Sequence, residues 1–477
     1  MKRTSLYLIA ISFVASLGGF LFGYDTAIIS GCNSFLEAQF ELSKAMLGWV
    51  ASSALLGTIA GTILAGSITD RYGRKKALIV AATALTISAI GSMLTPQFLA
   101  DAGTEVWLTS SRGFAFNSLI IFRLIGGVGV GITAAVAPIY ISEQTLPKNR
   151  GRFVSIYQLS ITLGILLAFL VDWLVLNQAG DAAGIISGEK SGFFNWLFVQ
   201  ELWRGMFGTE VPIALMFLIL LIFTPESPRW LVAQNRIPQA LRVLVRTSGE
   251  EIAQVQLQEI KESMNEEKGG IRELLKKFMR RPLLIGILLP MFSHLSGIAA
   301  IMYFAPNIIN EAVESVQSAF LGAVLVGVVN SAFTFVAIYF IERSGRRKLL
   351  LIGVIGAFLS LTATGIMFAL GSTLIIIPLL FYVASFAFSY GPITWVIISE
   401  IFPTRVRGLA ASIGTFSLMV TGFFITLSNP VLIEKIMPSG TFFLYAVLTI
   451  PAIWFIWKFV PETKGKTLEE IERSWKK

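Results

Sequence analysis

The chain has 477 residues, of which 55% are hydrophobic and 14% are charged, and its mean hydropathy is +0.73. Soluble domains carry about 25% charged residues, so the composition excludes an ordinary water-soluble protein. One cysteine, Cys32, excludes an intrachain disulfide, and one histidine, His294, excludes multi-histidine metal sites and most histidine-based catalytic centres. The net charge of +9 is compatible with nucleic-acid binding, an anionic surface or membrane topology, and the placement of the charges decides between these.

Twelve apolar stretches follow one another along the chain, each close to the roughly 20 residues that a membrane-spanning helix needs. They cover about 8–30, 46–68, 77–94, 118–141, 153–176, 205–224, 283–304, 318–340, 349–369, 374–399, 408–430 and 441–459. The first stretch contains Asp25 and no small-residue cleavage site, so we expect a retained helix rather than a cleaved signal peptide. The sequence therefore predicts an all-α membrane protein with twelve transmembrane helices.

The basic residues are distributed unevenly among the connecting segments. With both termini in the cytoplasm, the outer loops hold Lys44, Arg112, Lys190, Arg204 and Lys435, Arg123 lies inside the fourth span, and all other Lys and Arg are cytoplasmic. Cytoplasmic loops of membrane proteins collect Lys and Arg. The positive charge therefore indicates orientation in the membrane, and we expect no nucleic-acid partner.

Three short motifs occur twice, at equivalent places in the two halves of the chain. Residues 70–76, between spans two and three, recur as 342–348 between spans eight and nine. The other two pairs are Glu143 with Arg150 against Glu400 with Arg407, and Pro-Glu-Ser at 225–227 against Pro-Glu-Thr at 461–463. We therefore expect two six-helix halves in the same orientation, the parallel repeat of transporters whose solute site lies near the midplane.

These repeats divide the chain into four predicted parts. They are an N-terminal half (1–224), a cytoplasmic linker with amphipathic helices (225–281), a C-terminal half (282–460) and a cytoplasmic tail (461–477). The linker spaces its apolar residues three and four apart, which is typical of surface helices. It is too short to bury a substantial core alone, so we expect no separate catalytic domain there.

Six motifs stand in order along essentially the whole chain. They are Gly-Gly-Phe-Leu-Phe-Gly-Tyr-Asp at 18–25, Asp-Arg-Tyr-Gly-Arg at 70–74, Arg-Leu-Ile-Gly-Gly-Val-Gly at 123–129, Pro-Glu-Ser-Pro-Arg-Trp-Leu at 225–231, Glu-Ile-Phe-Pro at 400–403 and Pro-Glu-Thr-Lys-Gly at 461–465. Together they resemble the sugar-porter family of the major facilitator superfamily. The resemblance implies the major facilitator fold and a secondary active transporter that imports a monosaccharide or related polyol with a proton by alternating access. A proton-independent facilitative carrier of a sugar, inositol or non-sugar solute is the alternative.

Asp25 lies in the first predicted span and Arg123 in the fourth. Charges in the membrane interior are costly and are usually functional. A carboxylate that pairs with a guanidinium in one state and is released in another can act as a proton switch. In proton symporters of the family the matching aspartate accepts the proton, the arginine is its partner, and a carboxylate matching Glu210 is linked to coupling. The resemblance thus implies coupling by Asp25, Arg123 and Glu210, with the proton as coupling ion and no cofactor or metal; a static ion pair is the alternative.

The repeated cytoplasmic charges resemble a salt-bridge network that holds the inner ends of the two halves together when the site faces outward. Its members here are Arg74, Glu143 and Arg150 of the first half and Arg346, Glu400 and Arg407 of the second. Exposed ion pairs are individually weak, yet a network present in one state can bias two states of similar free energy. Simple positive-inside anchoring is the alternative, although it does not explain the repeated glutamates.

A polyol needs hydrogen-bond partners that replace water and aromatic faces on which to stack. The positions that contact sugar in the family are occupied here by Phe22, Gln158, Ser293, His294, Tyr303, Asn330 and Trp395. Several amides of the family pattern are absent: span seven reads Ser293-His294 where two glutamines are usual, and span eleven has Leu418, Met419 and Gly422. Because unpaired hydroxyls lose binding energy, glucose or xylose cannot be assumed as the substrate. His294 is either a satisfied core residue or a replacement for an amide that contacts a substrate hydroxyl.

Two further classes deserve comparison with a transporter. A membrane-embedded sensor should have a long signalling tail, and a membrane enzyme should have a nucleophile, base or metal constellation within the spans; the sequence has neither. We therefore expect a non-enzymatic, monomeric, multi-pass protein of the bacterial cytoplasmic (inner) membrane with both termini cytoplasmic. Its expected partners are a small polyhydroxylated solute, the proton and the lipid bilayer.

Overall fold

The structure is a computed structural model that describes residues 2–96, 111–146, 150–185, 193–265, 271–313, 315–464, 470–471 and 475. All regular structure in these ranges is helical. Eleven segments in them are long and apolar enough to cross a membrane. The predicted all-α membrane class is therefore confirmed.

The first five spans are single helices: α1 (Lys2–Phe40), α2 (Lys44–Tyr72), α3 (Arg74–Met93), α4 (Ser111–Gln144) and α5 (Arg150–Ile185). The sixth span follows α6 (Phe193–Asn195) and the π-helix η3 (Trp196–Gln200), and it is divided into α7 (Leu202–Gly208) and α8 (Glu210–Phe223). The break at Thr209 was not predicted, because the apolar stretch continues through it. It places Glu210 in the first turn of α8.

Breaks also divide the seventh and tenth spans. The seventh consists of α13 (Arg280–Leu295) and α14 (Ile298–Asn310), separated at Gly297, whose φ of 88° favours a glycine. The eighth and ninth spans are α15 (Val316–Ser344) and α16 (Arg346–Ala369). After the 3₁₀-helix η5 (Thr373–Ile375), the tenth consists of α17 (Ile376–Phe388) and α18 (Tyr390–Ile401), which meet at Ser389.

The last two predicted spans lie in one long segment, α19 (Thr404–Phe459). Met437 interrupts it with a φ of 64°, and Pro438, which has no backbone N–H to donate, follows directly. The interruption separates the predicted spans 408–430 and 441–459. The eleven apolar segments therefore contain the twelve predicted spans.

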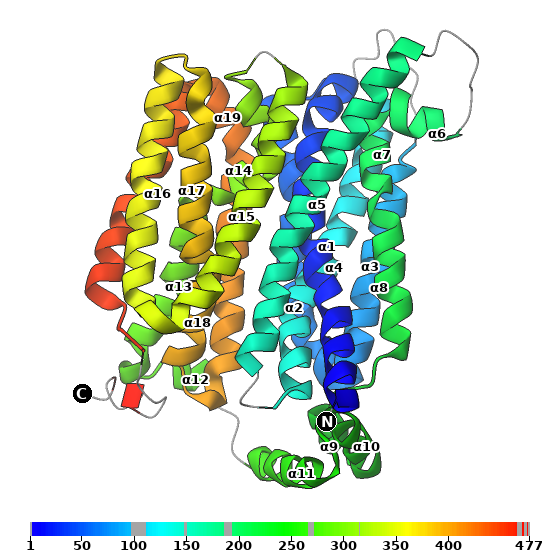
Figure 1. Ribbon diagram of the computed structural model, residues 1–477, viewed down its shortest axis with the longest axis vertical. Helices are drawn as coiled ribbons and strands as arrows, with labels where there is room; N and C mark the ends of the chain where they lie inside the picture. Colours follow the sequence, from blue (N-terminus) through cyan, green and yellow to red (C-terminus); the bar gives the residue numbers. More distant parts are fainter. Residues whose placement is uncertain are drawn as a thin grey trace.

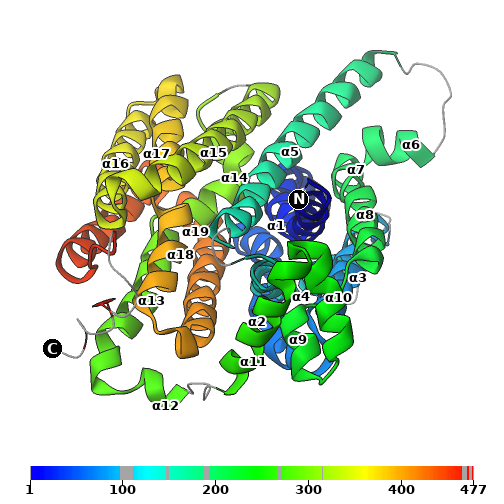
Figure 2. The same cartoon turned by 60° about the horizontal axis from the view of Figure 1, so that its bottom comes forward.

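The helices stand in two groups, with α1–α8 on one side and α13–α19 on the other (Figure 1). Across the boundary α2 packs against α19, α5 against α15 and α1 against α14. Linker helices α9 (Pro228–Ala233), α10 (Ile237–Ser248) and α11 (Glu250–Asn265) lie beneath the end of the first group at which α1 begins, as Figure 2 shows. The short α12 (Ile271–Leu274) and η4 (Lys277–Met279) lead into the second group.

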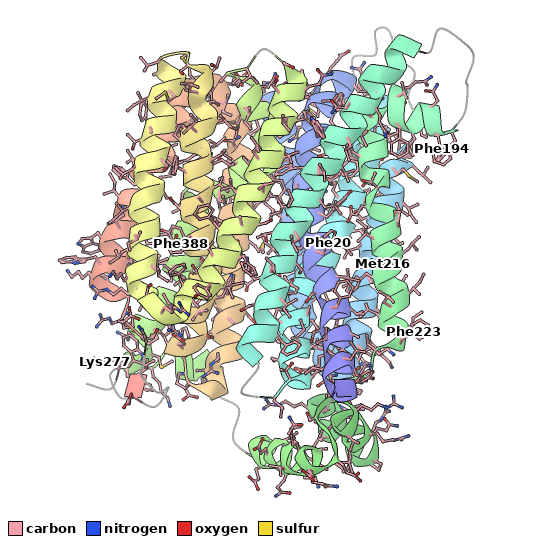
Figure 3. All side chains as sticks on the ribbon, in the orientation of Figure 1. Phe20, Phe194, Met216, Phe223, Lys277 and Phe388 are labelled. Carbon is pink, nitrogen blue, oxygen red and sulfur yellow. The ribbon has the colours of Figure 1, made fainter. Side chains whose placement is uncertain are left out.

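Large apolar side chains point outward around the bundle. Met216 and Phe223 project from α8 in Figure 3, with 42% and 77% of their surface exposed. Such residues match a hydrocarbon surround, in which helices satisfy their own backbone polar groups. The bundle therefore has the surface of a protein that spans a bilayer several times.

Candidate functional site

A buried ion pair joins the first and fourth spans in the middle of the N-terminal half. Arg123 Nη1 donates to Asp25 Oδ1 at 2.5 Å, and the two side chains are 0% and 7% exposed. The guanidinium also lies over the Phe207 ring, 5.7 Å from its centroid. Its Nε and Nη2 groups are buried and have no hydrogen-bond partner among the described residues. Nε and Nη2 of Arg123 are therefore available to donate to a second acceptor, in addition to the contact of Nη1 with Asp25.

Glu210 completes a buried charge cluster with this pair. It is 2% exposed and interacts electrostatically with both Asp25 and Arg123. The preceding residue, Thr209, shares a hydrogen bond of 2.7 Å with the Tyr24 hydroxyl, which connects the break between α7 and α8 to α1. The structure thus brings together all three residues expected to couple proton movement.

A fourth buried charge of the N-terminal half, Asp172 on α5, was missed from the sequence. It is 1% exposed and lies within the predicted fifth span. The signal was available, because Asp172 is an acidic residue in an apolar stretch, the same feature that singled out Asp25. It was overlooked because no family motif surrounds it.

The candidate solute residues of the seventh span lie beside α19. Ser293 is buried, and its Oγ lies 2.8 Å from the Pro290 carbonyl and 3.3 Å from His294 Nδ1. The imidazole of His294 lies directly against Gly422: a Cβ added there would come within 2.7 Å of His294 Cδ2. The small residue in the eleventh span therefore makes the room that the ring occupies.

Two other candidate solute residues lie where α5 meets α15. Ser331 Oγ donates to the Thr162 carbonyl at 3.0 Å, and Asn330 precedes Ser331 while Gln158 stands one turn before Thr162. Asn330 is 5% exposed and Gln158 is half-buried. This contact brings their helices together at the boundary between the two halves.

The aromatic candidates are distributed over three helices. Phe22 on α1 and Trp395 on α18 are half-buried, whereas Tyr303 on α14 is 4% exposed. The backbone carbonyl of Tyr303 accepts a hydrogen bond of 2.8 Å from Asn33 Nδ2, which joins α14 to α1.

The two halves are held together toward the ends that lie away from the linker helices. Besides Asn33 and Tyr303, Asn307 Nδ2 donates to Ser34 Oγ at 3.1 Å, and the Trp49 and Phe423 rings pack edge-to-face at 6.4 Å. At the opposite ends of α2 and α19, a Cβ built on Gly66 or Gly408 would meet nothing within 4 Å. The contacts thus hold the two halves together at the ends remote from the linker helices and leave open space at Gly66 and Gly408 on the linker side.

The repeated charges that the sequence predicts to be cytoplasmic form one cluster in each half. In the first, Arg74 Nε lies 3.0 Å from Glu143 Oε2, and Ser227 Oγ donates to the same carboxylate at 2.5 Å. Glu226 accepts backbone N–H groups at the start of α3, with Arg74 N at 2.9 Å. Glu143 therefore binds an arginine and a hydroxyl group, and Glu226 binds the N-terminus of α3.

The second cluster repeats the first almost atom for atom. Arg346 Nη2 lies 3.0 Å from Glu400 Oε1, Thr463 Oγ1 donates to Glu400 Oε2 at 2.5 Å, and Glu462 accepts Arg346 N at 3.0 Å. Capping by Glu226 and Glu462 was not predicted, although both stand in repeated motifs. A carboxylate at a helix N-terminus satisfies free N–H groups and the helix dipole.

A glycine of positive φ precedes each capped helix. Gly73 has a φ of 94° and Gly345 a φ of 85°. An added Cβ would lie 2.3 Å from Glu226 Oε2 at the first position and 2.7 Å from Glu462 Oε2 at the second. Both the backbone angle and the close approach of the carboxylate therefore require glycine.

The two capping carboxyls differ in their affinity for a proton. Burial raises the pKa of Glu226 despite its backbone hydrogen bonds. At Glu462 burial acts in the same direction, but the N–H groups of Lys464, Arg346, Arg347 and Thr463 together hold the pKa below its usual value.

The remaining predicted members of the cytoplasmic network are Arg150 and Arg407. The side chain of Arg150 lies outside the described residues. Arg407 Nε and Nη2 donate to the Phe402 carbonyl of the same half at 3.4 Å. The ion pairs Arg74–Glu143 and Arg346–Glu400 each join helices within one half.

Comparison with known proteins agrees with this architecture. The family described as sugar (and other) transporters matches residues 11–475. The chain is 37% identical to the arabinose-proton symporter of Bacillus subtilis (strain 168), over 98% of this chain and 95% of the relative. It is 35% identical to the D-xylose-proton symporter of Escherichia coli (strain K12), over 99% and 97% of the two chains.

Solved structures give the same answer. The inward-open xylose transporter XylE from E. coli superposes with a TM-score of 0.81 at 35% identity, covering 98% of this chain and 100% of that one. Its complex with 6-bromo-6-deoxy-D-glucose gives a TM-score of 0.77, also at 35% identity, over 98% and 99%. With the helical architecture, these matches show that the chain belongs to the sugar (and other) transporter family, and that it is a multi-pass membrane transporter and not an enzyme.

Proposed function

We propose that this protein is a secondary active transporter that imports a monosaccharide or related polyol together with a proton by alternating access. The observation that carries the proposal is the buried Asp25–Arg123 pair beside Glu210, in the interior of a sugar-transporter fold. Relatives named as arabinose-proton and D-xylose-proton symporters support it.

The unpaired donor groups of Arg123, Nε and Nη2, suggest how binding of a proton would rearrange the ion pairs of the cluster. Nη1 holds Asp25, while Nε and Nη2 have no acceptor among the described residues, and Glu210 lies within electrostatic range. A proton on Asp25 removes the negative charge that attracts Nη1, so the guanidinium then favours Glu210. Because Asp25 and Glu210 lie on different spans, this exchange alters how α1, α4 and α8 are held together.

Alternating access requires that the contacts between halves exist in one state and not in the other. The outer contacts of Asn33, Asn307 and Trp49 belong to the state described here. In the opposite state, the cytoplasmic clusters around Glu143 and Glu400 would approach each other and extend to Arg150 and Arg407. Both clusters are already ordered within their own halves, so little further ordering is needed.

The solute site would lie between the halves, among Phe22, Gln158, Ser293, His294, Tyr303, Asn330 and Trp395. The contact between Ser331 and Thr162 supports this position, because it joins the helices of Gln158 and Asn330. His294, set against Gly422, would present a ring nitrogen where an amide is usual. We expect a small polyhydroxylated solute, with the bacterial cytoplasmic membrane as location, both termini cytoplasmic and a monomeric transport unit.

The test is Asp25→Asn in proteoliposomes. A thermal-shift screen of the purified protein against pentoses, hexoses, inositols and polyols first selects the sugar that stabilises it most. With that sugar, Asp25→Asn should lose accumulation driven by an inward proton gradient while it retains counterflow exchange. Glu37→Gln, which makes the same carboxylate-to-amide change in a residue paired with Lys44, is the matched control and should accumulate sugar normally. Accumulation by wild type that persists at full extent after the pH gradient is collapsed would refute proton symport. Sugar entry that only equalises the inner and outer concentrations, even with the proton gradient present, would favour a facilitative carrier.

A further inference from the structure

Asp172 has a buried carboxyl group that is not part of the proposed coupling cluster of Asp25, Arg123 and Glu210. It is 1% exposed, and among the described residues no side chain donates a hydrogen bond to either oxygen. The carboxyl faces the backbone of Gly31 on α1, where an added Cβ would come within 2.3 Å of Asp172 Oδ2. The glycine therefore makes space for a carboxyl group in a tight contact between two transmembrane helices.

The position of this contact along α1 is informative. Gly31 stands six residues after Asp25, which at 1.5 Å per residue places it about 9 Å closer to the outer end. Asn33 and Ser34, which contact α14, stand two and three residues after Gly31. Asp172 thus lies between the coupling cluster and the closed outer contact.

Two protic groups of α1 lie within electrostatic range of Asp172. Tyr24 and Cys32 on α1 both interact electrostatically with Asp172. The Tyr24 hydroxyl shares its 2.7 Å hydrogen bond with Thr209, the residue next to Glu210. Tyr24 is therefore within electrostatic range of the Asp172 carboxyl and is hydrogen-bonded to the residue that precedes Glu210, all within the N-terminal half.

The other helices that pack against α5 place few titratable side chains near Asp172. On α4, Arg123 is engaged by Asp25, and Arg112 pairs with Glu41 at the outer surface. On α7, Arg204 pairs with Glu201. On α15 the described spanning residues include one titratable side chain, Tyr339, near the cytoplasmic end. Tyr24 and Cys32 are therefore the titratable neighbours of Asp172.

We propose that Asp172 is a second proton-binding group, which receives a proton from the external solution when the outer contact opens and passes it inward to the Asp25–Arg123–Glu210 cluster. The proton first binds a carboxylate oxygen of Asp172. Each hydroxyl of Tyr24 and Thr209 then gives up its own proton as it accepts another, and the proton ends on Glu210 or Asp25. O–H bonds alone form and break, so no oxidant, reductant or further reactant is needed. The inference rests on the proposed proton coupling.

The test compares Asp172→Asn, an isosteric change that cannot carry the proton, with Glu37→Gln as matched control and Asp172→Ser as a second neutral replacement. Three quantities are measured in proteoliposomes or on the purified protein: the initial rate of proton-driven uptake against external pH, sugar counterflow without a gradient, and the infrared carboxyl band of protonated side chains. We expect both Asp172 variants to take up sugar several-fold more slowly with an altered pH profile, while counterflow stays at the wild-type rate. One carboxyl band of the wild type should disappear from both.

Three results would overturn the proposal. They are a wild-type uptake rate and pH profile in the Asp172 variants, equal slowing of uptake and counterflow, which indicates a structural role, and an unchanged carboxyl band. The infrared readout does not depend on coupling, and Asp25→Asn tests coupling without changing Asp172. Failure of this inference can therefore be distinguished from failure of the proposed function.

Discussion

The two halves of the molecule are alike at their cytoplasmic ends and different in their interiors. At the ends, Glu143 with Arg74 and Glu400 with Arg346 make equivalent ion pairs, and Glu226 and Glu462 cap equivalent helices. In the interior, the buried charged residues of the described chain all belong to the first half: Asp25, Arg123, Asp172, Arg204 and Glu210. The repeat has therefore kept the groups that join helices within each half at this end, whereas the buried interior charges of the described residues lie in one half.

This difference suggests that the two halves have different functions. A half with ionisable groups in the membrane interior can bind a proton, whereas a half that lacks them can adapt its polar and small residues to the solute. If the proposed solute site is correct, the pairing of His294 with Gly422 in the second half is an adaptation of this kind.

The largest effect is expected from Arg123→Leu. It leaves Asp25 and Glu210 in the interior without their counter-charge, and removing one partner of a buried pair typically costs about 3–5 kcal/mol. Thermal unfolding in detergent should show a large decrease in Tm, and adding Asp25→Asn should recover part of it. An unchanged Tm in the single variant would show that the interior charges of the first half are not coupled.

A smaller effect is expected at the glycines of the cytoplasmic ends. Gly73→Ala and Gly345→Ala should each cost about 1–3 kcal/mol, because their positive φ with ψ of 168° and 146° is a backbone conformation that essentially only glycine adopts. Gly73→Ala should cost more, because its Cβ would approach the capping carboxylate to 2.3 Å rather than 2.7 Å. Gly66→Ala, inside α2 with no atom within 4 Å, is the control and should raise Tm slightly, because alanine favours a helix over glycine by about 1 kcal/mol. Equal, negligible costs at all three positions would contradict the capping geometry.

His294→Ala tests the second half. If the ring makes one hydrogen bond to the solute, its loss should cost about 0.5–1.5 kcal/mol of binding, a several-fold rise in the half-saturation constant at a normal protein level. Gly422→Ala should reproduce part of the effect by displacing the ring. An unchanged half-saturation constant in both variants would leave His294 as a packing residue.

The smallest effect is the opposite pH dependence of the two capping carboxyls, followed as Tm from about pH 7 to 4, the range in which glutamates titrate. The folded-state pKa of Glu462 is below its unfolded value, so its stabilisation is present above the unfolded pKa and is lost as pH falls through the folded pKa. The folded-state pKa of Glu226 is raised, so protonation as pH falls favours the folded state. Glu462→Gln should therefore lower Tm near neutral pH and little in acid. Glu226→Gln should change the slope in the other direction, and slopes of the same sign would refute the assignment.

Much of the fold followed from the sequence because apolar length and charge placement are strong, local signals. The breaks at Thr209, Gly297 and Met437 could not be located in the same way, because they depend on backbone angles inside continuous apolar runs. The approach of Arg123 to Asp25 was expected from family position. Capping by Glu226 and Glu462 depends on distant segments meeting in space, and no spacing along the chain predicts it.

The central claim, that the interior charges of the first half couple solute to proton movement, is tested most directly by recording external pH while sugar enters proteoliposomes containing the protein. The sugar identified by thermal shift should make the external medium more alkaline with the wild type, and should leave its pH unchanged with Asp25→Asn although counterflow continues. Sugar entry through the wild type with no change in external pH would contradict the claim.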